Sequence, residues 1–269
     1  MSAADRIARW MFGFYMVAFF VYLFAPLVIM GAATFNTSRF PTVTPWQGTT
    51  LQWFSELAKD NAMWQSVWTS IIVAFFVVLI AVPIGTAAAL ILTSLHSRAR
   101  GFLYALMVSP LLTPGVVIGI STLVLWRQLG VGGGVFLIVV AQASFIICYV
   151  MLMVAARLQR FDRTQEEAAL GLGASKLMVF RRILLPFLKP ALIAGSLLAV
   201  LQSVENYNTT LFVRGFDTPL TVFIATKVRT GLTPAVNALA LIMIVITVLG
   251  AIAYEVARRR QAVAQQATD

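Results

Sequence analysis

The sequence has 269 residues, of which 60% are hydrophobic and only 11% are charged, whereas about 25% of the residues of a soluble domain are charged. A mean hydropathy of +0.88 over the whole chain excludes burial of all these side chains in a water-soluble core, so the surrounding medium is predicted to be largely lipid. The net charge of +10 does not indicate a nucleic-acid partner, because the basic residues lie between apolar runs and not on a polar surface.

Six apolar runs are long enough for transmembrane helices, which need about 20 residues each. Five of them carry no charge, and the other contains only Lys189 near one end, from which its amine can extend to the interface. The runs cover 10–38, 61–97, 101–126, 128–156, 183–204 and 230–254. We therefore predict an all-α, polytopic membrane protein with about six transmembrane helices, a single domain over 1–269 and core spans over about 65–258.

The first apolar run follows Arg6 and Arg9, but it is much longer than the roughly 7 to 15 apolar residues of a cleavable signal, so it is predicted to be an uncleaved anchor. With the amino terminus inside the cell, fourteen of the 20 Lys and Arg residues lie inside. Those left outside are Arg39, Lys59, Arg127, Arg214, Lys227 and Arg229. This bias predicts that both termini are cytoplasmic.

Small residues recur at helical spacing in three of the runs, and such faces let membrane helices approach closely. They are Ala81, Gly85 and Ala89, then Gly115 and Gly119, then Ala191, Gly195 and Ala199. Pro83, Pro110 and Pro114 also lie inside predicted spans, where carbonyl groups lose their intrahelical partners. Kinks are expected there, either around an internal path or simply for packing.

The longest charged segment on the predicted cytoplasmic side covers residues 157–189. Thr164 followed three residues later by Glu167 is the pattern of a capping box, so a short helix is predicted to begin near Thr164. Gly171 and Gly173 are predicted to end it. A second, amphipathic segment then leads into the next span, so the short helix would be held as a rigid lever between two membrane helices.

This segment resembles the EAA loop of bacterial ABC importer permeases. A Glu-Ala-Ala triplet, a glycine after three residues and Ile-x-Leu-Pro after nine more stand in the consensus spacing. The residues concerned are Glu166, Glu167, Ala168, Ala169, Gly173, Ile183, Leu185 and Pro186. The resemblance implies that they couple this chain to a separate ATPase subunit by docking into its cleft; the alternative is an ordinary amphipathic loop.

The sequence contains no G-x-x-x-x-G-K-[ST] phosphate-binding loop. This agrees with an ATPase on another chain, and the resemblance implies that this subunit is not an enzyme and has no cofactor, with ATP and Mg²⁺ on the partner. One cysteine, Cys148, and one histidine, His96, leave no material for a disulfide, a cysteine metal cluster or histidine-dependent hydrolysis, so no metal site is expected. Cys148 is expected to be a small packed residue.

Three further segments resemble spermidine/putrescine-type permease subunits, over residues 35–40, 46–54 and 233–240. The similarity extends from about residue 10 to about residue 257. It implies a type I ABC importer permease fold in the bacterial inner membrane. The implied partners are an ATPase dimer, a second related permease, a periplasmic substrate-binding protein and membrane lipid, and the implied function is import of a small, polyamine-like solute by alternating access.

A carboxylate stands at the outer end of the fifth run, where it is costly unless it is solvated, paired or facing a cavity. This residue is Glu205, and its hydrogen-bonding neighbours in the predicted substrate path are Gln202, Asn206, Tyr207 and Asn208. The alternative is a polar cluster that merely ends the helix. Polyamine-type permeases usually have two adjacent acidic residues here, so the single charge suits a monocation, a zwitterion or a short diamine as well as spermidine.

Residues 220–228 have helical apolar spacing and predict an interfacial helix that forms an outer gate, a binding-protein contact or a plain loop. Two other classes of function remain as alternatives to the importer. A stand-alone carrier or channel would be favoured by inverted repeats and mid-membrane charges, which the sequence does not show. An intramembrane enzyme would need motifs such as G-x-S-G or H-E-x-x-H, which are absent.

Overall fold

The computed structural model describes residues 3–95, 99–231 and 233–266, so His96 lies outside the described residues. Within those ranges the regular structure is helical, and the β-type pairing is an isolated bridge between Asn36 and Thr49. The chain divides into two compact units, residues 1–61 with 226–269 and residues 62–225. The single domain over 1–269 stays a prediction.

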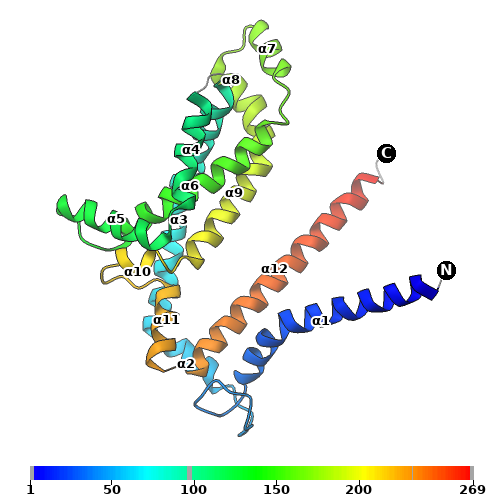
Figure 1. The fold of residues 1–269 in the computed structure, drawn as a ribbon, viewed down its shortest axis with the longest axis vertical. Helices are drawn as coiled ribbons and strands as arrows, with labels where there is room; N and C mark the ends of the chain where they lie inside the picture. The colour runs from blue at the N-terminus through cyan, green and yellow to red at the C-terminus, as the bar shows by residue number, and fades with distance from the viewer. Residues whose placement is uncertain (1–2, 96–98, 232, 267–269) are drawn as a thin grey trace. The chain divides into compact units, whose positions relative to one another are not determined.

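The first unit contains α1 (Ala3–Ala33), α2 (Gln52–Lys59) and α12 (Pro234–Gln266). Figure 1 shows α1 and α12 diverging from their common end near α2. The loop before α2 is organised by Asn36, whose Nδ2 donates to the carbonyl of Thr42 at 2.9 Å and whose carbonyl accepts from Trp53 Nε1 at 2.7 Å. Residues 35–40 and 46–54, the first two segments that carry the family resemblance, therefore fold together as one loop.

The second unit contains the remaining helices in the described chain. They are α3 (Asn61–Ser94), α4 (Ala99–Leu112), α5 (Gly115–Gln128), α6 (Val135–Leu158), α7 (Thr164–Gly171), α8 (Lys176–Val179), the π-helical turn η1 (Phe180–Leu184), α9 (Leu185–Glu205), α10 (Thr210–Val213) and α11 (Leu220–Thr230), whose last residues belong to the first unit. Most of the buried core of this unit lies on α3, α6 and α9.

Two of the three predicted small-residue faces, those of α3 and α9, are helix contacts in this core. A Cβ added to Gly85 of α3 would lie 2.9 Å from Val150 Cβ of α6, and one added to Gly195 of α9 would lie 3.5 Å from Val150 Cγ1. Val150 itself is fully buried. Because lipid offers no hydrophobic drive for helix association, this close packing is what holds the three helices together.

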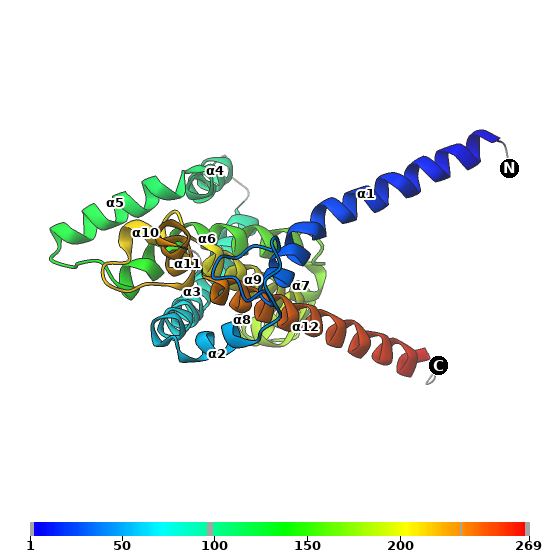
Figure 2. The same ribbon diagram turned by 90° about the horizontal axis from the view of Figure 1, so that it is seen from below.

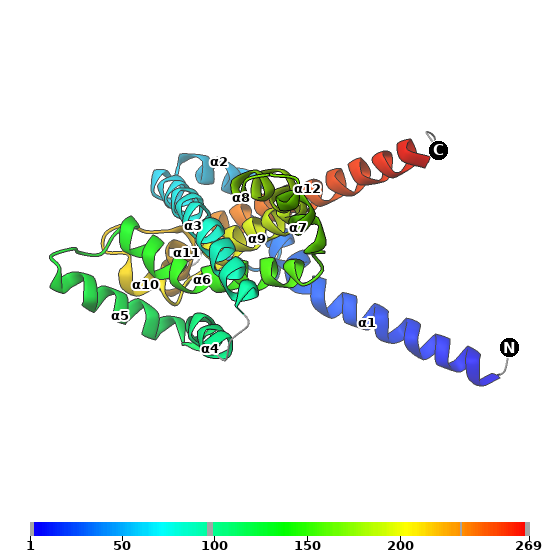
Figure 3. The same ribbon diagram turned by 90° about the horizontal axis from the view of Figure 1, so that it is seen from above.

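The third predicted span, residues 101–126, bends where a proline kink was expected, and it is divided there into two helices. The axes of α4 and α5 differ by 98°, and Figures 2 and 3 show α4 nearly end-on while α5 lies across the view. Pro114 has no N–H and disfavours a helical Thr113, so the helix stops and restarts at Gly115. By contrast, α3 continues through Pro83.

Four described helical segments are long and apolar enough to cross a membrane: Ile7–Ala33, Asn61–Ser94, Val135–Leu158 and Lys176–Glu205. The bent pair α4 and α5 makes a fifth candidate, and the sixth predicted run corresponds to the shorter apolar stretch Pro234–Gly250 of α12. The count of six and the cytoplasmic position of both termini remain predictions.

Candidate functional site

The short helix α7 begins at Thr164, as predicted, but not through a capping box. One carboxylate oxygen of Asp162 accepts from the Thr164 N–H at 3.0 Å and from the Thr164 hydroxyl at 2.8 Å, and the Glu167 N–H bonds to the Arg163 carbonyl at 3.1 Å. The capping-box prediction is therefore wrong, because Thr164 is already the first residue of the helix and the Glu167 N–H that its hydroxyl oxygen would accept bonds to the Arg163 carbonyl instead. The two bonds from Thr164 hold the pKa of the Asp162 carboxyl below its usual value.

The end of α7 is a Schellman motif around Gly173, which has φ +84°. The Gly173 N–H bonds to the Leu170 carbonyl at 2.9 Å, and the Ala174 N–H bonds to the Ala169 carbonyl at 3.1 Å. A Cβ at Gly173 would meet no other heavy atom within 4 Å. Glycine is thus required by the left-handed backbone and not by close packing.

The predicted coupling residues lie on the outside of this segment or at its edge. Glu167, Ala168, Gly173, Leu185 and Pro186 are exposed, and Glu166, Ala169 and Ile183 are half-buried. Beside them the apolar side chains of Leu170, Leu172, Leu177 and Met178 are exposed, with Leu172 at 90%. The segment therefore presents a surface with both acidic and apolar groups.

Ile183, Leu185 and Pro186 lie where the segment passes into α9. The π-helical turn η1 ends at Leu184, directly before Pro186 enters the first turn of α9. Proline cannot donate to the carbonyl four residues earlier and its ring crowds that carbonyl, so a wider turn is accommodated here. These three residues thus lie where the coupling segment, the part of residues 157–189 that precedes α9, joins that helix.

Two arginines that the sequence did not single out fasten the coupling segment to the helices of its unit. The Arg163 Nη2 donates to the Thr93 carbonyl in the last turns of α3 at 2.7 Å. The Arg157 Nε donates to the Phe187 carbonyl of α9 at 3.2 Å. No local spacing relates residues 30 or 70 positions apart, so sequence reasoning had no signal for these pairs.

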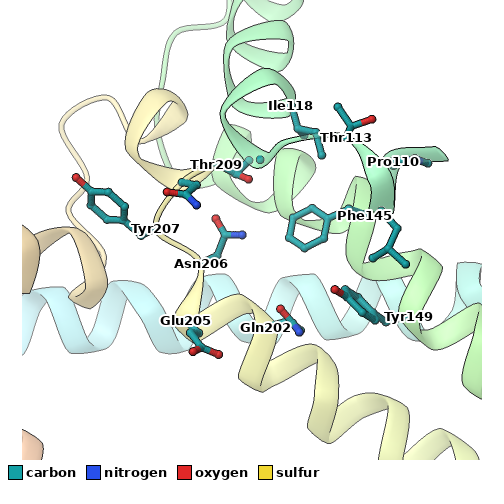
Figure 4. Close-up of a pocket in the computed structure, with 13 residues that line it drawn as sticks. Pro110, Thr113, Ile118, Phe145, Tyr149, Gln202, Glu205, Asn206, Tyr207 and Thr209 are labelled. Carbon is teal, nitrogen blue, oxygen red and sulfur yellow. The ribbon is translucent and has the colours of Figure 1, made fainter. Parts of the chain in front are cut away.

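At the other end of the second unit, a cavity of about 250 Å³ opens beside the end of α9. Figure 4 shows the residues that line it. The five residues of the predicted substrate path all belong to its lining: Gln202, Glu205, Asn206, Tyr207 and Asn208. The helix α9 has 21 residues and is therefore about 30 Å long, so it connects the coupling segment to this cavity.

The rest of the cavity wall comes from α4, α5 and α6 and from the loop after α9. These residues are Pro110, Leu111, Thr113, Gly115, Ile118, Phe145, Tyr149 and Thr209. Sequence reasoning missed them, although Pro110 and Pro114 indicated a break in this span. Glu205 is the only charged residue among the 13 that line the cavity. The lining of the cavity therefore carries a single, negative charge.

A buried chain of hydrogen bonds positions Asn206 at the cavity. Ser203 Oγ donates to Gln142 Oε1 at 2.6 Å, and Gln142 Nε2 donates to Thr210 Oγ1 at 2.8 Å. The Thr210 hydroxyl and N–H both donate to Asn206 Oδ1, at 3.1 and 3.2 Å. In Figure 4 the side chains of Glu205 and Asn206 leave the end of α9 in different directions. Asn206 therefore uses its oxygen to hold the loop after α9.

Elsewhere in the described residues, no group of three or more His, Cys, Asp and Glu residues could hold a metal ion. Cys148 is buried, and its Sγ donates to the Met107 carbonyl at 2.9 Å. It is thus a packed residue, as expected, and its bond also joins α6 to α4.

Comparison with known families gives a match over most of the chain. The profile described as binding-protein-dependent transport system inner membrane component matches residues 81–263. The spermidine/putrescine transport system permease protein PotC of Escherichia coli K12 is 33% identical over 256 residues, which cover 94% of this chain and 96% of that protein. The putrescine transport system permease protein PotI of the same strain is 34% identical over 252 residues, 90% of this chain and 89% of that protein.

Solved structures share the fold at lower sequence identity. A chain of a bacterial ABC transporter involved in the import of the acidic polysaccharide alginate has a TM-score of 0.74 at 17% identity, covering 96% of this chain and 98% of that one. A chain of the MetNI methionine ABC transporter in an inward-facing conformation has a TM-score of 0.56 at 17% identity, covering 80% of this chain and 99% of that one.

Proposed function

The chain belongs to the family of binding-protein-dependent inner-membrane transport components, the permease subunits of ABC importers, and we propose that it carries a small cationic or zwitterionic, polyamine-like solute from periplasm to cytoplasm. As an inner-membrane permease of this family it works with an ATPase and a substrate-binding protein. The family is one of membrane components and not of enzymes.

The observation that carries the proposal is the cavity at the end of α9. The predicted polar residues all belong to its lining, Glu205 is the one carboxylate among them, and no basic side chain lines it. Glu205 is exposed, so its carboxylate stays solvated and attracts a positively charged group that comes near it. A positively charged group on the solute is therefore favoured there. The names of the relatives PotC and PotI, which refer to spermidine and putrescine, support an amine in that role.

In the proposed mechanism, the coupling segment links transport of the solute to ATP hydrolysis on the partner. In our proposal α7 docks into a cleft of the ATPase, where the acidic and apolar side chains around Glu167 and Leu172 make the contact. ATP and Mg²⁺ bind on the ATPase dimer and not on this chain. Closure of that dimer moves α7, and the bonds from Arg163 to α3 and from Arg157 to α9 pass the movement to the helices around the cavity.

Two further partners belong to the proposal. A second, related permease completes the translocation path, and lipid covers the remaining apolar surface. The need for such cover is clearest on α1, where Trp10 and Tyr22 are more than 80% exposed. A stand-alone carrier or channel is not favoured, because such a protein would not need the exposed, rigidly capped helix α7 as a contact for an ATPase.

The proposal is tested by reconstituting the permease pair, the ATPase and the binding protein in proteoliposomes and measuring ATP-dependent uptake of labelled putrescine and of 4-aminobutanoate. Glu205→Gln keeps the size of the side chain but removes its charge, so uptake should fall at least tenfold while ATP hydrolysis continues. The matched control is Glu56→Gln, which changes an exposed carboxylate of α2 and should leave uptake unchanged. Solute flux without any ATPase would overturn the importer assignment.

A further inference from the structure

The break between α4 and α5 places the amino end of a helix in the cavity wall. Thr113 and Gly115, on either side of Pro114, both line the cavity. The helix α5 has 14 residues, and Pro114 before it provides no side-chain cap. The N–H groups of Val117 and Ile118 bond to the Pro114 carbonyl, whereas those of Gly115 and Val116 have no carbonyl within the helix to bind. This end of α5 therefore carries partial positive charge.

A buried hydroxyl without a partner lies at the same place. Thr209 is fully buried and lines the cavity, and its Oγ1 has no hydrogen-bond partner among the described residues. It packs against α5 so closely that a Cβ on Gly115 would lie 2.9 Å from Thr209 Oγ1. Buried hydroxyls are nearly always bonded in folded proteins, so this one indicates a group that is bound during transport.

The opposite charge is provided on another part of the same wall. Glu205 is the only charged residue of the lining, and Gln202, one turn earlier on α9, lies beside it. The rings of Phe145 and Tyr149 on α6 provide apolar surface in the same cavity. The cavity thus has a donor-rich, positive end at α5, and the one carboxylate of its lining, which is exposed, lies at its rim near Gln202.

We propose that this cavity binds a zwitterionic amino carboxylate, an inference that rests on the proposed transport function. The solute's carboxylate accepts from the N–H groups of Gly115 and Val116 and from the Thr209 hydroxyl. Its ammonium group lies toward Glu205, and its methylene groups lie along Phe145 and Tyr149. A diamine is bound less well, because its second ammonium would meet the positive end of α5 and leave the Thr209 hydroxyl and these N–H groups without an acceptor.

Two probes separate these solutes. Putrescine and 4-aminobutanoate both have a four-carbon chain and an ammonium group, and differ in whether the other end is an ammonium or a carboxylate. Equilibrium binding of each is measured on the purified permease pair with its ATPase and without the binding protein, so that the binding protein's own preference does not decide the result. We expect 4-aminobutanoate to bind at least tenfold more tightly than putrescine.

Point variants test whether the Thr209 hydroxyl and the Glu205 carboxylate cause the expected binding of the two probes. Thr209→Val removes the hydroxyl at nearly constant size and should weaken binding of 4-aminobutanoate about tenfold without changing that of putrescine, and Thr209→Ser should keep the wild-type affinity. The matched control is Thr69→Val, because the Thr69 hydroxyl bonds to the Gln65 carbonyl of its own helix and Thr69 lies outside the cavity lining. Glu205→Gln should weaken the binding of both probes.

The outcomes also separate this inference from the proposed function. Equal or tighter binding of putrescine, or an unchanged 4-aminobutanoate affinity in a folded Thr209→Val complex, overturns the zwitterion site. If the complex nevertheless imports putrescine with ATP, the importer function stands. If neither probe is taken up with ATP and the binding protein, both the solute assignment and this inference fail.

Discussion

The guanidinium of Arg157, in the last turn of α6, lies 4.3 Å from the centre of the Phe187 ring of α9, and its Nε donates to the carbonyl of the same residue. The Phe161 ring, in the loop between α6 and α7, lies 5.0 Å from that ring, measured between ring centroids. One arginine thus joins the adjoining ends of α6 and α9 next to the segment proposed to contact the ATPase.

Replacing Arg157 should uncouple ATP hydrolysis from transport. Arg157→Gln removes the contact with the ring, which is worth about 1 kcal/mol, so the coupled conformation should lose about fivefold in population. We expect uptake to fall about fivefold while binding-protein-stimulated ATP hydrolysis stays near the wild-type rate. Arg160→Gln, in the same loop and exposed, is the control. Parallel loss of hydrolysis and uptake would argue against a transmitting role.

We expect each substitution at Gly173 to be tolerated according to how readily the new residue adopts a positive φ. Its φ is +84° and its Cβ position is open, so Gly173→Val should lose uptake severely at a cost of about 1–2 kcal/mol. Gly173→Asn should lose less, because Asn adopts this conformation more readily. Gly171→Ala, inside α7 with open space around its Cβ, should be neutral. Uptake at matched membrane levels is the measurement, and equal effects of Val and Asn would contradict the backbone explanation.

Asp162 should hold the start of α7 through the side-chain oxygen that accepts two bonds from Thr164. Asp162→Ala should increase amide hydrogen exchange over residues 163–167, whereas Asp162→Asn, which keeps an acceptor oxygen, should change it less. The pKa of this carboxyl is lowered in the folded chain. The stabilisation is therefore present above the usual Asp pKa and is lost as the pH falls through the lowered value. Constant protection at neutral pH in Asp162→Ala would exclude this role.

Gln142 should stabilise the second unit through its buried bonds. Gln142→Leu leaves the hydroxyls of Ser203 and Thr210 without a bond that each has now, at a cost of about 0.6–1.7 kcal/mol for such a bond in a membrane protein. We expect a lower unfolding midpoint in detergent and weaker solute binding, since Thr210 positions Asn206. Ser144→Ala, whose hydroxyl bonds within α6, should have little effect. An unchanged midpoint for Gln142→Leu would show that the network adds no stability.

Local patterns in the sequence were sufficient to predict the long helices and the coupling segment. The apolar runs predicted where the long helices lie, and the spacing from Glu167 to Pro186 indicated the coupling segment. Both patterns act over a few neighbouring residues, through hydropathy and backbone conformation. The same holds for Gly173, because a left-handed helix end is a local requirement that glycine meets. Even so, the Thr164 hydroxyl does not cap α7, because Asp162 accepts from Thr164 and the Glu167 N–H bonds to the Arg163 carbonyl.

The tertiary structure alone decided how the third apolar run bends and what surrounds Glu205. An uncharged run with two prolines is compatible with a mild kink as well as with the 98° bend between α4 and α5. In the fold, α5 packs at Gly115 and Gly119 against Thr209, directly before α10. The bonds from Arg157 to Phe187 and from Gln142 to Thr210 join residues 30 and 68 positions apart, and no short-range pattern relates such pairs. The cavity likewise exists only where four helices meet, so the sequence determined its one charge, while the fold determined that this charge shares a wall with Thr209 and the uncapped end of α5.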